Sequence, residues 1–286
     1  MKLGDVTPLS GYLGDLLVFP SAPTPTPTSG GYFYMKSLAD NNTFSFIFAV
    51  NSAITATSIS YSLNGGSTWT DIPKPSQTQT YQITGLTSGA VVYWKGVARN
   101  WGYNRTRCAL VSNGNCEIGG NIMSLLYGDN FADKTEIEYP WAFFSFFNGS
   151  RIVSAENLSL PATTLSTNCY NSMFSSCNYL VTPPSLPATT LAASCYTSMF
   201  ASCGSMESAP ELPATTLVAG CYTSMFYSCS NLTYVKCLAT SGINQNNSTN
   251  GWMQFVSSTG TFVKASSATW GTGISGIPNG WSIVNA

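Results

Sequence analysis

The chain has 286 residues and very little charge, with 11 lysines and arginines against 12 aspartates and glutamates and no histidine. At the usual domain size of roughly 100 to 150 residues, this length predicts about two compact units. The weak and balanced charge leaves no basic field for nucleic acid or an anionic membrane surface. No stretch approaches the roughly 20 continuous apolar residues of a membrane-spanning helix.

The first 19 residues contain a small unit, LGD, at positions 3–5 and again at 13–15, before the strand-like run LLVF. The segment is too short to bury a core of its own. Polar residues and turn formers interrupt it, so it does not fit a Sec-type signal peptide, and earlier removal of a signal peptide is the alternative. We expect residues 1–19 to be an anchor that becomes ordered on a partner or on copies of itself. Its predicted contact residues are Leu3, Leu13, Leu16, Val18 and Phe19.

Residues 20–31 form a linker with the sequence PSAPTPTPTSGG. Its prolines alternate with threonine and favour extended polyproline II at about 3.1 Å per residue. The linker is therefore predicted to be a stiff spacer of roughly 35 Å that holds the remainder clear of the anchor.

Residues 32–117 alternate between apolar and polar side chains with a period of two, as in the run FSFIF at 44–48. The NGG sequence at 64–66 predicts a hairpin turn. Short strands with turns every 8 to 12 residues or so predict a β-sandwich. The runs SYSLNGGSTWTDI and ITGLTSGAVVYWKGVA resemble fibronectin type III or bacterial immunoglobulin-like modules. In such a sandwich Trp69 and Trp94 are expected in the core.

From Leu160 the chain contains three adjoining copies of a 26-residue unit, and 13 of the 26 positions are identical in all three. Fixed periods of about 20 to 29 residues are typical of leucine-rich-repeat solenoids, in which each copy buries its apolar edge against its neighbours. Partial copies flank the perfect ones. AFFSFF at 142–147 echoes CYNSMF, and Trp252 falls 26 residues after Phe226. These partial copies are the expected end caps.

Five apolar residues of one copy have the spacing i, i+1, i+4, i+5 and i+8, which predicts one face of a short helix against the core. Pro161 favours an extended segment before it. The five residues are Cys169, Tyr170, Met173, Phe174 and Cys177.

The predicted fold class is therefore multidomain β plus α/β. It comprises an N-terminal β anchor (1–19), the linker (20–31), a small immunoglobulin- or fibronectin-III-like β-sandwich (32–117), and a C-terminal leucine-rich-repeat solenoid of 26-residue period with end caps (118–286).

The units LPATTL…CYxSMFxSCxxL, the preceding GNIMSLLYGDNF and the closing TGTFVKASS…GIPNGWSIV resemble the BspA-type leucine-rich-repeat proteins of gut Bacteroides and their phages. This resemblance covers residues 118–286. The N-terminal LGD…YLGDLLVF separately resembles the leader of phage tail and head-fibre proteins from the same hosts. The family implies surface adhesion or protein interaction and no catalytic residues.

Six of the nine cysteines occupy fixed positions in the copies. Equivalent residues of adjacent copies stack, so we expect these thiols to be free, buried and slow to react. Zinc ligation is not expected, because the chain has no histidine and no CxxC pair. A disulfide between Cys108 and Cys116 is left open, since it depends on whether their Cα atoms approach within about 7 Å. The six cysteines are Cys169, Cys195, Cys221, Cys177, Cys203 and Cys229.

Catalysis needs positioned acids, bases or nucleophiles, and the chain offers no histidine and 12 carboxylates. One acidic group could serve a glycosidase or bind calcium, but we expect it to be a solvated rim. No catalytic, cofactor-binding or metal-binding residue is predicted. The members of the acidic group are Asp129, Asp133, Glu136 and Glu138.

Aromatic residues outside the fixed pattern are the candidates for facing a ligand, because exposed rings can stack on sugars or anchor a protein partner. Two of them follow the last predicted sandwich strand, and two occupy variable positions of the copies. Ordinary packing is the alternative for each one. The candidates are Trp101, Tyr103, Tyr179 and Tyr227.

Together these patterns predict a non-enzymatic structural protein of a phage virion. We expect a head or tail fibre or appendage that presents the repeats for adhesion to a host-surface protein or glycan, and that contacts other virion proteins through its N-terminus. It is expected to be a homo-oligomer at the virion surface, assembled in the host cytoplasm and released by lysis, without nucleic-acid binding or membrane insertion. A capsid decoration protein, a bacterial surface adhesin and a glycan-active enzyme are the alternatives.

Overall fold

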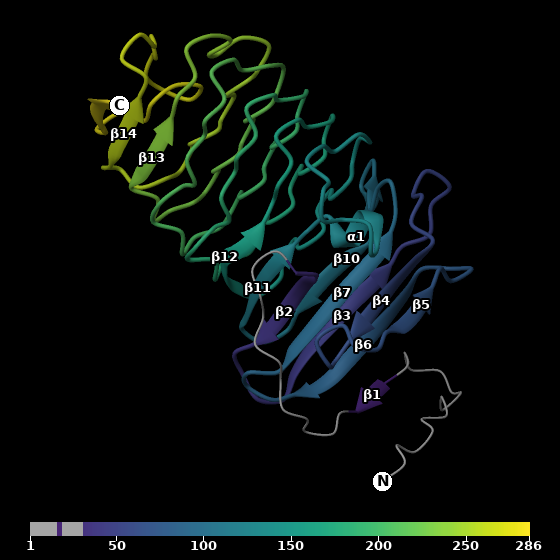
Figure 1. Cartoon of the computed structure of the whole chain (residues 1–286). Coiled ribbons are helices and arrows are strands. Elements are labelled where there is room, and N and C mark those ends of the chain that lie inside the picture. The colour runs from purple at the N-terminus through teal and green to yellow at the C-terminus, as the bar shows by residue number, and fades with distance from the viewer. Residues whose placement is uncertain (1–15, 19–30) are drawn as a thin grey trace.

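The computed structural model describes residues 16–18 and 31–286. Two sheets occupy the N-terminal part, and the 26-residue copies lie beyond them as successive layers (Figure 1). The first sheet has the order β1 (Leu16–Val18), β6 (Gln79–Leu86), β3 (Asn42–Phe48), β10 (Ala109–Ser112). The second has the order β12 (Ile152–Ser159), β11 (Cys116–Asn121), β2 (Phe33–Ser37), β7 (Val91–Val97), β4 (Ser58–Ser62), β5 (Thr70–Pro73).

The strands of the two sheets follow the period of two in the sequence. Along β3 the side chains alternate between buried and half-buried, so that Phe44, Phe46 and Phe48 all point into the core. The turn between β4 and β5 contains Gly65 and Gly66 with φ of 74° and 88°, a conformation that glycine adopts without steric cost. The turn and the alternating strands predicted for this region are thus present.

Trp94 lies in the core as predicted, with 1% of its surface exposed. Trp69 does not, and the prediction for it was wrong. Its ring is half-buried at the surface, where it meets the ring of Tyr32 edge-on at 4.8 Å and lies 4.5 Å below the Lys95 ammonium group. A cation over the face of an indole ring is attracted by the electrons of the ring.

Part of the predicted anchor is a strand of this chain's own first sheet. β1 runs parallel to β6, with Leu16 opposite Gln82 and Val18 opposite Thr84. The other predicted anchor residues, Leu3, Leu13 and Phe19, lie outside the described residues.

Each 26-residue copy contains a series of tight turns in which every fourth residue is left-handed. In the first perfect copy the φ angles of Asn168, Ser172 and Ser176 are 56°, 56° and 61°. An α-helix requires right-handed φ at every position, so these residues prevent one. The run 169–177 is therefore a chain of turns.

Amide groups within a layer alternate between two kinds of partner. The N–H of Met173 closes a turn by donating to the carbonyl of Tyr170 at 3.2 Å. The N–H groups of Tyr170 and Phe174 instead cross to the next layer and donate to the carbonyls of Cys195 and Met199 at 3.0 and 2.9 Å. One half of the amides shapes a layer, and the other half holds neighbouring layers together.

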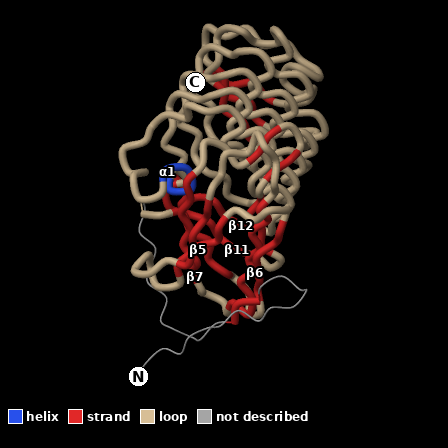
Figure 2. Tube along the Cα trace, turned by 90° about the vertical axis from the view of Figure 1, so that its right-hand side faces the viewer, coloured by secondary structure: helices blue, strands red, loops and turns tan. Residues whose placement is uncertain are grey.

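The prediction of an α/β leucine-rich-repeat solenoid is wrong. The one helix in the described residues, α1 (Ser124–Tyr127), has four residues and precedes the perfect copies. Bridges such as that between Thr164 and Thr190 are isolated and do not merge into a continuous parallel sheet along the copies. Prolines such as Pro183, Pro184 and Pro187 lack the N–H that such a sheet would need. Figure 2 shows the layers as loops, with most strands gathered in the N-terminal part.

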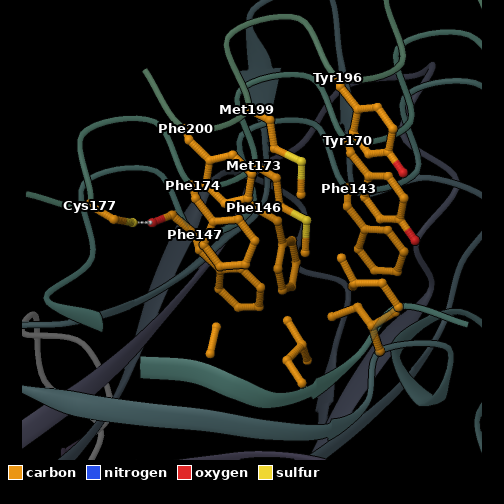
Figure 3. Packing of buried hydrophobic residues seen from close by; sticks show 14 of the residues in the cluster. Phe143, Phe146, Phe147, Tyr170, Met173, Phe174, Cys177, Tyr196, Met199 and Phe200 are labelled. Carbon is orange, nitrogen blue, oxygen red and sulfur yellow. Dashed lines mark hydrogen bonds between the residues drawn. The ribbon is translucent and has the colours of Figure 1, made fainter. Parts of the chain in front are cut away.

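The five apolar residues predicted to face the core are all buried, although no helix carries them. Equivalent side chains of successive layers form columns (Figure 3). In one column the ring centroids of Phe33, Phe147, Phe174, Phe200 and Phe226 follow one another at 5.4, 5.4, 5.6 and 5.9 Å. In another, Phe143, Tyr170, Tyr196, Tyr222 and Trp252 follow at 5.8, 5.7, 6.1 and 6.2 Å.

The sheets and the layers share one continuous core. The phenylalanine column begins at Phe33 in β2, and β11 pairs with β2 on one side and with β12 on the other. At the far end, the ring of Trp270 stacks on Trp252 at 5.2 Å, and Trp252 donates from its indole nitrogen to the carbonyl of Gly276 at 2.8 Å. A three-stranded parallel sheet completes that end, formed by β13 (Tyr234–Cys237), β14 (Thr261–Lys264) and β15 (Ser282–Asn285).

Candidate ligand-binding surface

Three aromatic side chains from two distant segments meet on the surface where the sheets adjoin the layers. The ring centroids of Tyr103 and Trp141 lie 6.0 Å apart, and those of Trp141 and Phe144 lie 5.0 Å apart in an edge-to-face arrangement. Tyr103 is 42% exposed, and the other two rings are half-buried. We call these three residues the aromatic cluster.

A tight hairpin places Tyr103. Strands β8 (Gly102–Tyr103) and β9 (Thr106–Arg107) are joined by Asn104 and Arg105, whose φ angles of 38° and 74° are typical of a two-residue hairpin turn. Gly102 is needed because a Cβ atom there would come within 2.9 Å of Phe144. The hairpin can therefore lie directly against the first layer.

Trp141 has a strained backbone. Its φ is 63°, which costs a large non-glycine residue about 1 to 3 kcal/mol. At the equivalent position the next layers carry Asn168, Ser194 and Gly220, also left-handed and better suited to that conformation. The N–H of Trp141 donates to the carbonyl of Thr167 at 3.1 Å, so the inter-layer bonding holds the tryptophan in place. Residues with strained backbone cluster at active sites and ligand clamps.

Polar side chains continue the surface beyond the aromatic cluster. The position of Phe144 is taken in the following layers by Asn171, Thr197 and Thr223, all half-buried. Asn171 donates from its amide to Asn168 Oδ1 at 3.0 Å, and the two threonine hydroxyls donate to backbone carbonyls of the next layer at 2.8 and 2.6 Å. Amides and hydroxyls both donate and accept hydrogen bonds, so this column offers partners to a polar ligand.

The four residues predicted to face a ligand have different environments. Trp101 is fully buried, donates from its indole nitrogen to the carbonyl of Leu125 at 2.9 Å and meets Phe46 edge-on at 5.8 Å. Its ring belongs to the core, so the prediction was wrong for this residue. The apolar neighbours of Trp101 lie on other segments of the chain and are not evident from its own Gly- and Asn-rich surroundings.

Tyr179 and Tyr227 each have a partner of their own. The Arg151 guanidinium lies 4.0 Å from the Tyr179 ring and donates to its hydroxyl at 3.0 Å, and this ring is 42% exposed. Tyr227 is half-buried and meets the ring of Phe255 edge-on at 5.2 Å. Phe255, which is 61% exposed, was missed at the sequence level.

Trp141 and Phe144 were also missed as candidates. The signal that could have identified them is that they replace Asn, Ser, Thr or Gly of the perfect copies with large aromatic rings. The structure brings Tyr103 together with these two residues and not with Tyr179 or Tyr227.

The acidic group suggested by the sequence is spread over separate environments. Asp129 accepts from Lys95 at 2.8 Å and from the Tyr32 hydroxyl at 2.7 Å. The hydrogen bond from Lys95, followed by that from Tyr32, lowers the pKa of Asp129. Burial, strengthened by the bond to Asp129, raises the pKa of Tyr32 to about 12. Within residues 16–18 and 31–286, no three His, Cys, Asp or Glu side chains are grouped to hold a metal ion.

All nine cysteines are buried and free. The disulfide left open for Cys108 and Cys116 is absent from the described structure, and burial raises the pKa of each of these thiols to about 12. Burial also raises the pKa of Cys169 to about 12. These thiols are packing groups, protonated at neutral pH.

Protein-family models, curated proteins and solved structures were compared with the chain, and none matches it. The described structure is that of a layered repeat protein, built almost entirely of strands and turns, on a base of two sheets. In its described part, no helix has the length and apolar character to cross a membrane. The aromatic cluster is the candidate site that this geometry offers.

Proposed function

We propose that this chain is a non-enzymatic surface protein of a phage virion, a head or tail fibre or appendage, and that its aromatic cluster binds a glycan of the host surface. One observation carries the proposal. Trp141 is kept in a strained left-handed conformation, within an accessible group of rings, at a position where the following layers have asparagine, serine and glycine.

A saccharide fits the chemistry of this surface. Aromatic faces contact the apolar C–H faces of pyranose rings, and neighbouring amides and hydroxyls form hydrogen bonds with sugar hydroxyl groups. The aromatic cluster supplies the first kind of contact, and the column of Asn171, Thr197 and Thr223 supplies the second. The stacked layers provide a stiff support, since each is bonded to the next by backbone hydrogen bonds.

The proposed virion location has separate support. The leader resembles those of phage fibre proteins, and a proline-rich linker separates it from the folded body. The sequence motifs of residues 118–286 that resemble BspA-type proteins support adhesion rather than catalysis, and this support does not extend to the leucine-rich-repeat fold, which the layers lack. A homo-oligomer that contacts other virion proteins through residues 1–19 is the arrangement we propose.

The test replaces Trp141 with the residue that the next layer carries at the equivalent position. Trp141→Asn removes the indole while keeping a side chain suited to the left-handed backbone. We expect its binding to host cells and to a host glycan array to fall by about tenfold or more, as for loss of a central aromatic contact. Tyr103→Ala should weaken binding in the same direction.

Phe255→Asn is the matched control, because Phe255 is an exposed aromatic residue with φ of 63° outside the aromatic cluster. It should leave binding unchanged. Melting curves of all three variants would show that the fold is retained. Equal binding by Trp141→Asn and the parent protein would overturn the proposal.

A further inference from the structure

A second candidate site lies beside the sheets and is formed by residues other than the aromatic cluster. It is a cavity of about 360 Å³ between the end of β7, the end of α1 and the segment that leads into the first layer. Its size is within the range of small-ligand pockets, roughly 300 to 1,000 Å³. The residues that matter for its chemistry are Val97, Arg99, Tyr127, Glu138 and Tyr139.

Arg99 brings to this cavity a guanidinium group that has no ion-pair partner among the described residues. Its guanidinium lies 4.8 Å from the centre of the Tyr139 ring, and the side chain is exposed. Across residues 31–286, no carboxylate forms an ion pair with it, whereas Lys36, Lys95 and Lys236 are each paired. An unpaired guanidinium that is oriented by an aromatic ring is well suited to a bidentate carboxylate ligand.

Hydrogen bonds to Thr55 hold the backbone of Arg99 in place. The Thr55 hydroxyl oxygen accepts from the N–H groups of Arg99 and Asn100 at 2.9 and 3.2 Å and donates to Asn100 Oδ1 at 3.1 Å. Asn100 is itself buried. The arginine therefore projects from a fixed base, which reduces the entropy lost when a ligand binds.

The remaining walls combine apolar surface with a carboxylate. Val97 is 55% exposed, and Tyr127 and Tyr139 contribute ring surface. Glu138 lines the same cavity without pairing to Arg99. Burial raises the pKa of Tyr127, and the nearby Glu138 carboxylate adds to the rise, which agrees with a Glu138 carboxylate close to that hydroxyl.

We propose that this cavity binds the carboxylate-bearing pyranose of an acidic glycan. The ligand carboxylate accepts two hydrogen bonds from Arg99, the sugar hydroxyls donate to Glu138, and one face of the ring lies against Tyr139 and Val97. This site goes beyond adhesion at the aromatic cluster, because separate residues carry it and its ligand is distinguished by charge.

Calorimetry on the full chain at low salt tests this with paired probes. The first pair is trigalacturonate and its methyl ester, and the second is sialyllactose and lactose. We expect one of the charged members to bind. Its uncharged counterpart should bind with an affinity at least about tenfold lower. Arg99→Gln should reduce binding of the charged member to that of the uncharged one.

Arg105→Gln is the matched control, because Arg105 is exposed and forms no ion pair with the described residues. It should bind like the parent, and Trp141→Asn should also retain the acidic sugar. The proposal is overturned by equal binding of charged and uncharged members, by equal losses in Arg99→Gln and Arg105→Gln, or by no binding of either acidic probe. If acetate at equal concentration displaced the acidic probe, the cavity would recognise any carboxylate, and the proposal that it recognises the sugar would be overturned. If Trp141→Asn no longer bound the acidic probe, the binding site would be the aromatic cluster, and the proposal for the cavity would be overturned.

Discussion

Aromatic side chains pack differently in the sheets and in the layers. In the sheets the ring planes meet at steep angles, as for Phe46 with Trp101 at 89° and with Phe48 at 72°. In the layers equivalent rings are nearly parallel, with Phe200 and Phe226 inclined by 2°. A repeat related by translation places the same residue in the same orientation on every layer. Parallel offset stacking is therefore imposed by the repeat, whereas the sheets can select the edge-to-face geometry.

Backbone bonding differs in the same way. A sheet strand such as β7 pairs with a neighbour on each side, with β2 over residues 91–94 and with β4 over residues 93–97. A layer uses alternate amides for its own turns and the others for its neighbour. One layer alone would leave half of these amides without a partner, so its stability depends on the layers above and below.

The thiols show a third difference. Cys177, Cys203 and Cys229 donate from Sγ to a phenylalanine carbonyl of the preceding layer at 3.2, 3.2 and 3.0 Å, an interaction drawn in Figure 3 for Cys177. In the sheet region Cys108 forms a longer contact, 3.7 Å to the carbonyl of Ala49. Equivalent cysteines thus connect neighbouring layers through weak hydrogen bonds and form no disulfides.

The largest effect that we predict is alkaline unfolding driven by these cysteines. Burial raises the thiol pKa of Cys169 and Cys229 to about 12, whereas an unfolded cysteine ionises at about 8.5. Stability is complete below the unfolded pKa and is lost as the pH rises from there toward the folded pKa, at about 1.4 kcal/mol per thiol and pH unit. With nine buried thiols, the protein should unfold well below pH 12.

The slope of unfolding free energy against pH between about 8.5 and 9.5, below the range of tyrosine, measures this. Replacing the three cysteines 177, 203 and 229 with alanine should reduce the slope about three times as much as Cys108→Ala, whatever the packing cost of each change. Titration in denaturant without reductant should find nine free thiols. Three or fewer free thiols among the six cysteines of the perfect copies would mean that disulfides link the layers, contrary to the weak hydrogen bonds described for them.

Removal of one ring from each region has the next largest effect. Phe200→Ala and Phe46→Ala both empty a fully buried aromatic site and should cost about 3 to 5 kcal/mol in denaturant titrations. The layer variant should also make the neighbouring thiols of Cys177 and Cys203 react faster, while the sheet variant should not. A melting temperature for Phe200→Ala within about one degree of the parent would contradict its place in the column.

The sequence predicts one region better than the other for a physical reason. Strand alternation in β3 and the glycine turn at 65–66 are local rules, and both are found in the structure. In the layers the buried set 169–177 was predicted correctly, but its spacing fits a repeat of four residues as well as the 3.6 of a helix. Serine at every fourth position, as at Ser172 and Ser176, was the available sign of left-handed turns.

The candidate site was only partly predictable. Tyr103 was identified from its loop, whereas Trp141 and Phe144 lie some forty residues away and contact it only after the hairpin docks on the first layer. Such a contact depends on how a hairpin and a repeat pack together, which neither local pattern specifies. Arg99 and Tyr139 come together in the same manner, across the boundary between sheets and layers.

A smaller effect on stability, that of glycine against alanine at a left-handed position, distinguishes turns from a helix within the layers. Ser198 has φ of 53°, so Ser198→Gly should be more stable than Ser198→Ala by about 1 kcal/mol, because glycine has no Cβ penalty there. In a helix the order would be reversed by a similar amount, since alanine is the better helix former. Ala201→Gly in the same layer is the control and should be destabilising, because Ala201 is not left-handed. The denaturant midpoints of the three variants give this comparison. If Ser198→Ala were more stable than Ser198→Gly, the layers would contain a helix at this position.

The smallest effect on stability is expected from removing residues 1–19, which separates the edge of the first sheet from any assembly role. Loss of β1 removes a three-residue parallel pairing and leaves β6 at the sheet edge, while the shared core from Phe33 onward is untouched. The truncated chain should therefore remain folded, with a melting temperature close to that of the parent, and yet be missing from particles. Deletion of residues 1–15 keeps β1 and reports on the preceding segment alone. Particle proteomics of both variants makes the measurement, and undiminished incorporation of the chain that lacks residues 1–19 would eliminate the anchor, because β1 would then serve only the sheet that it already joins.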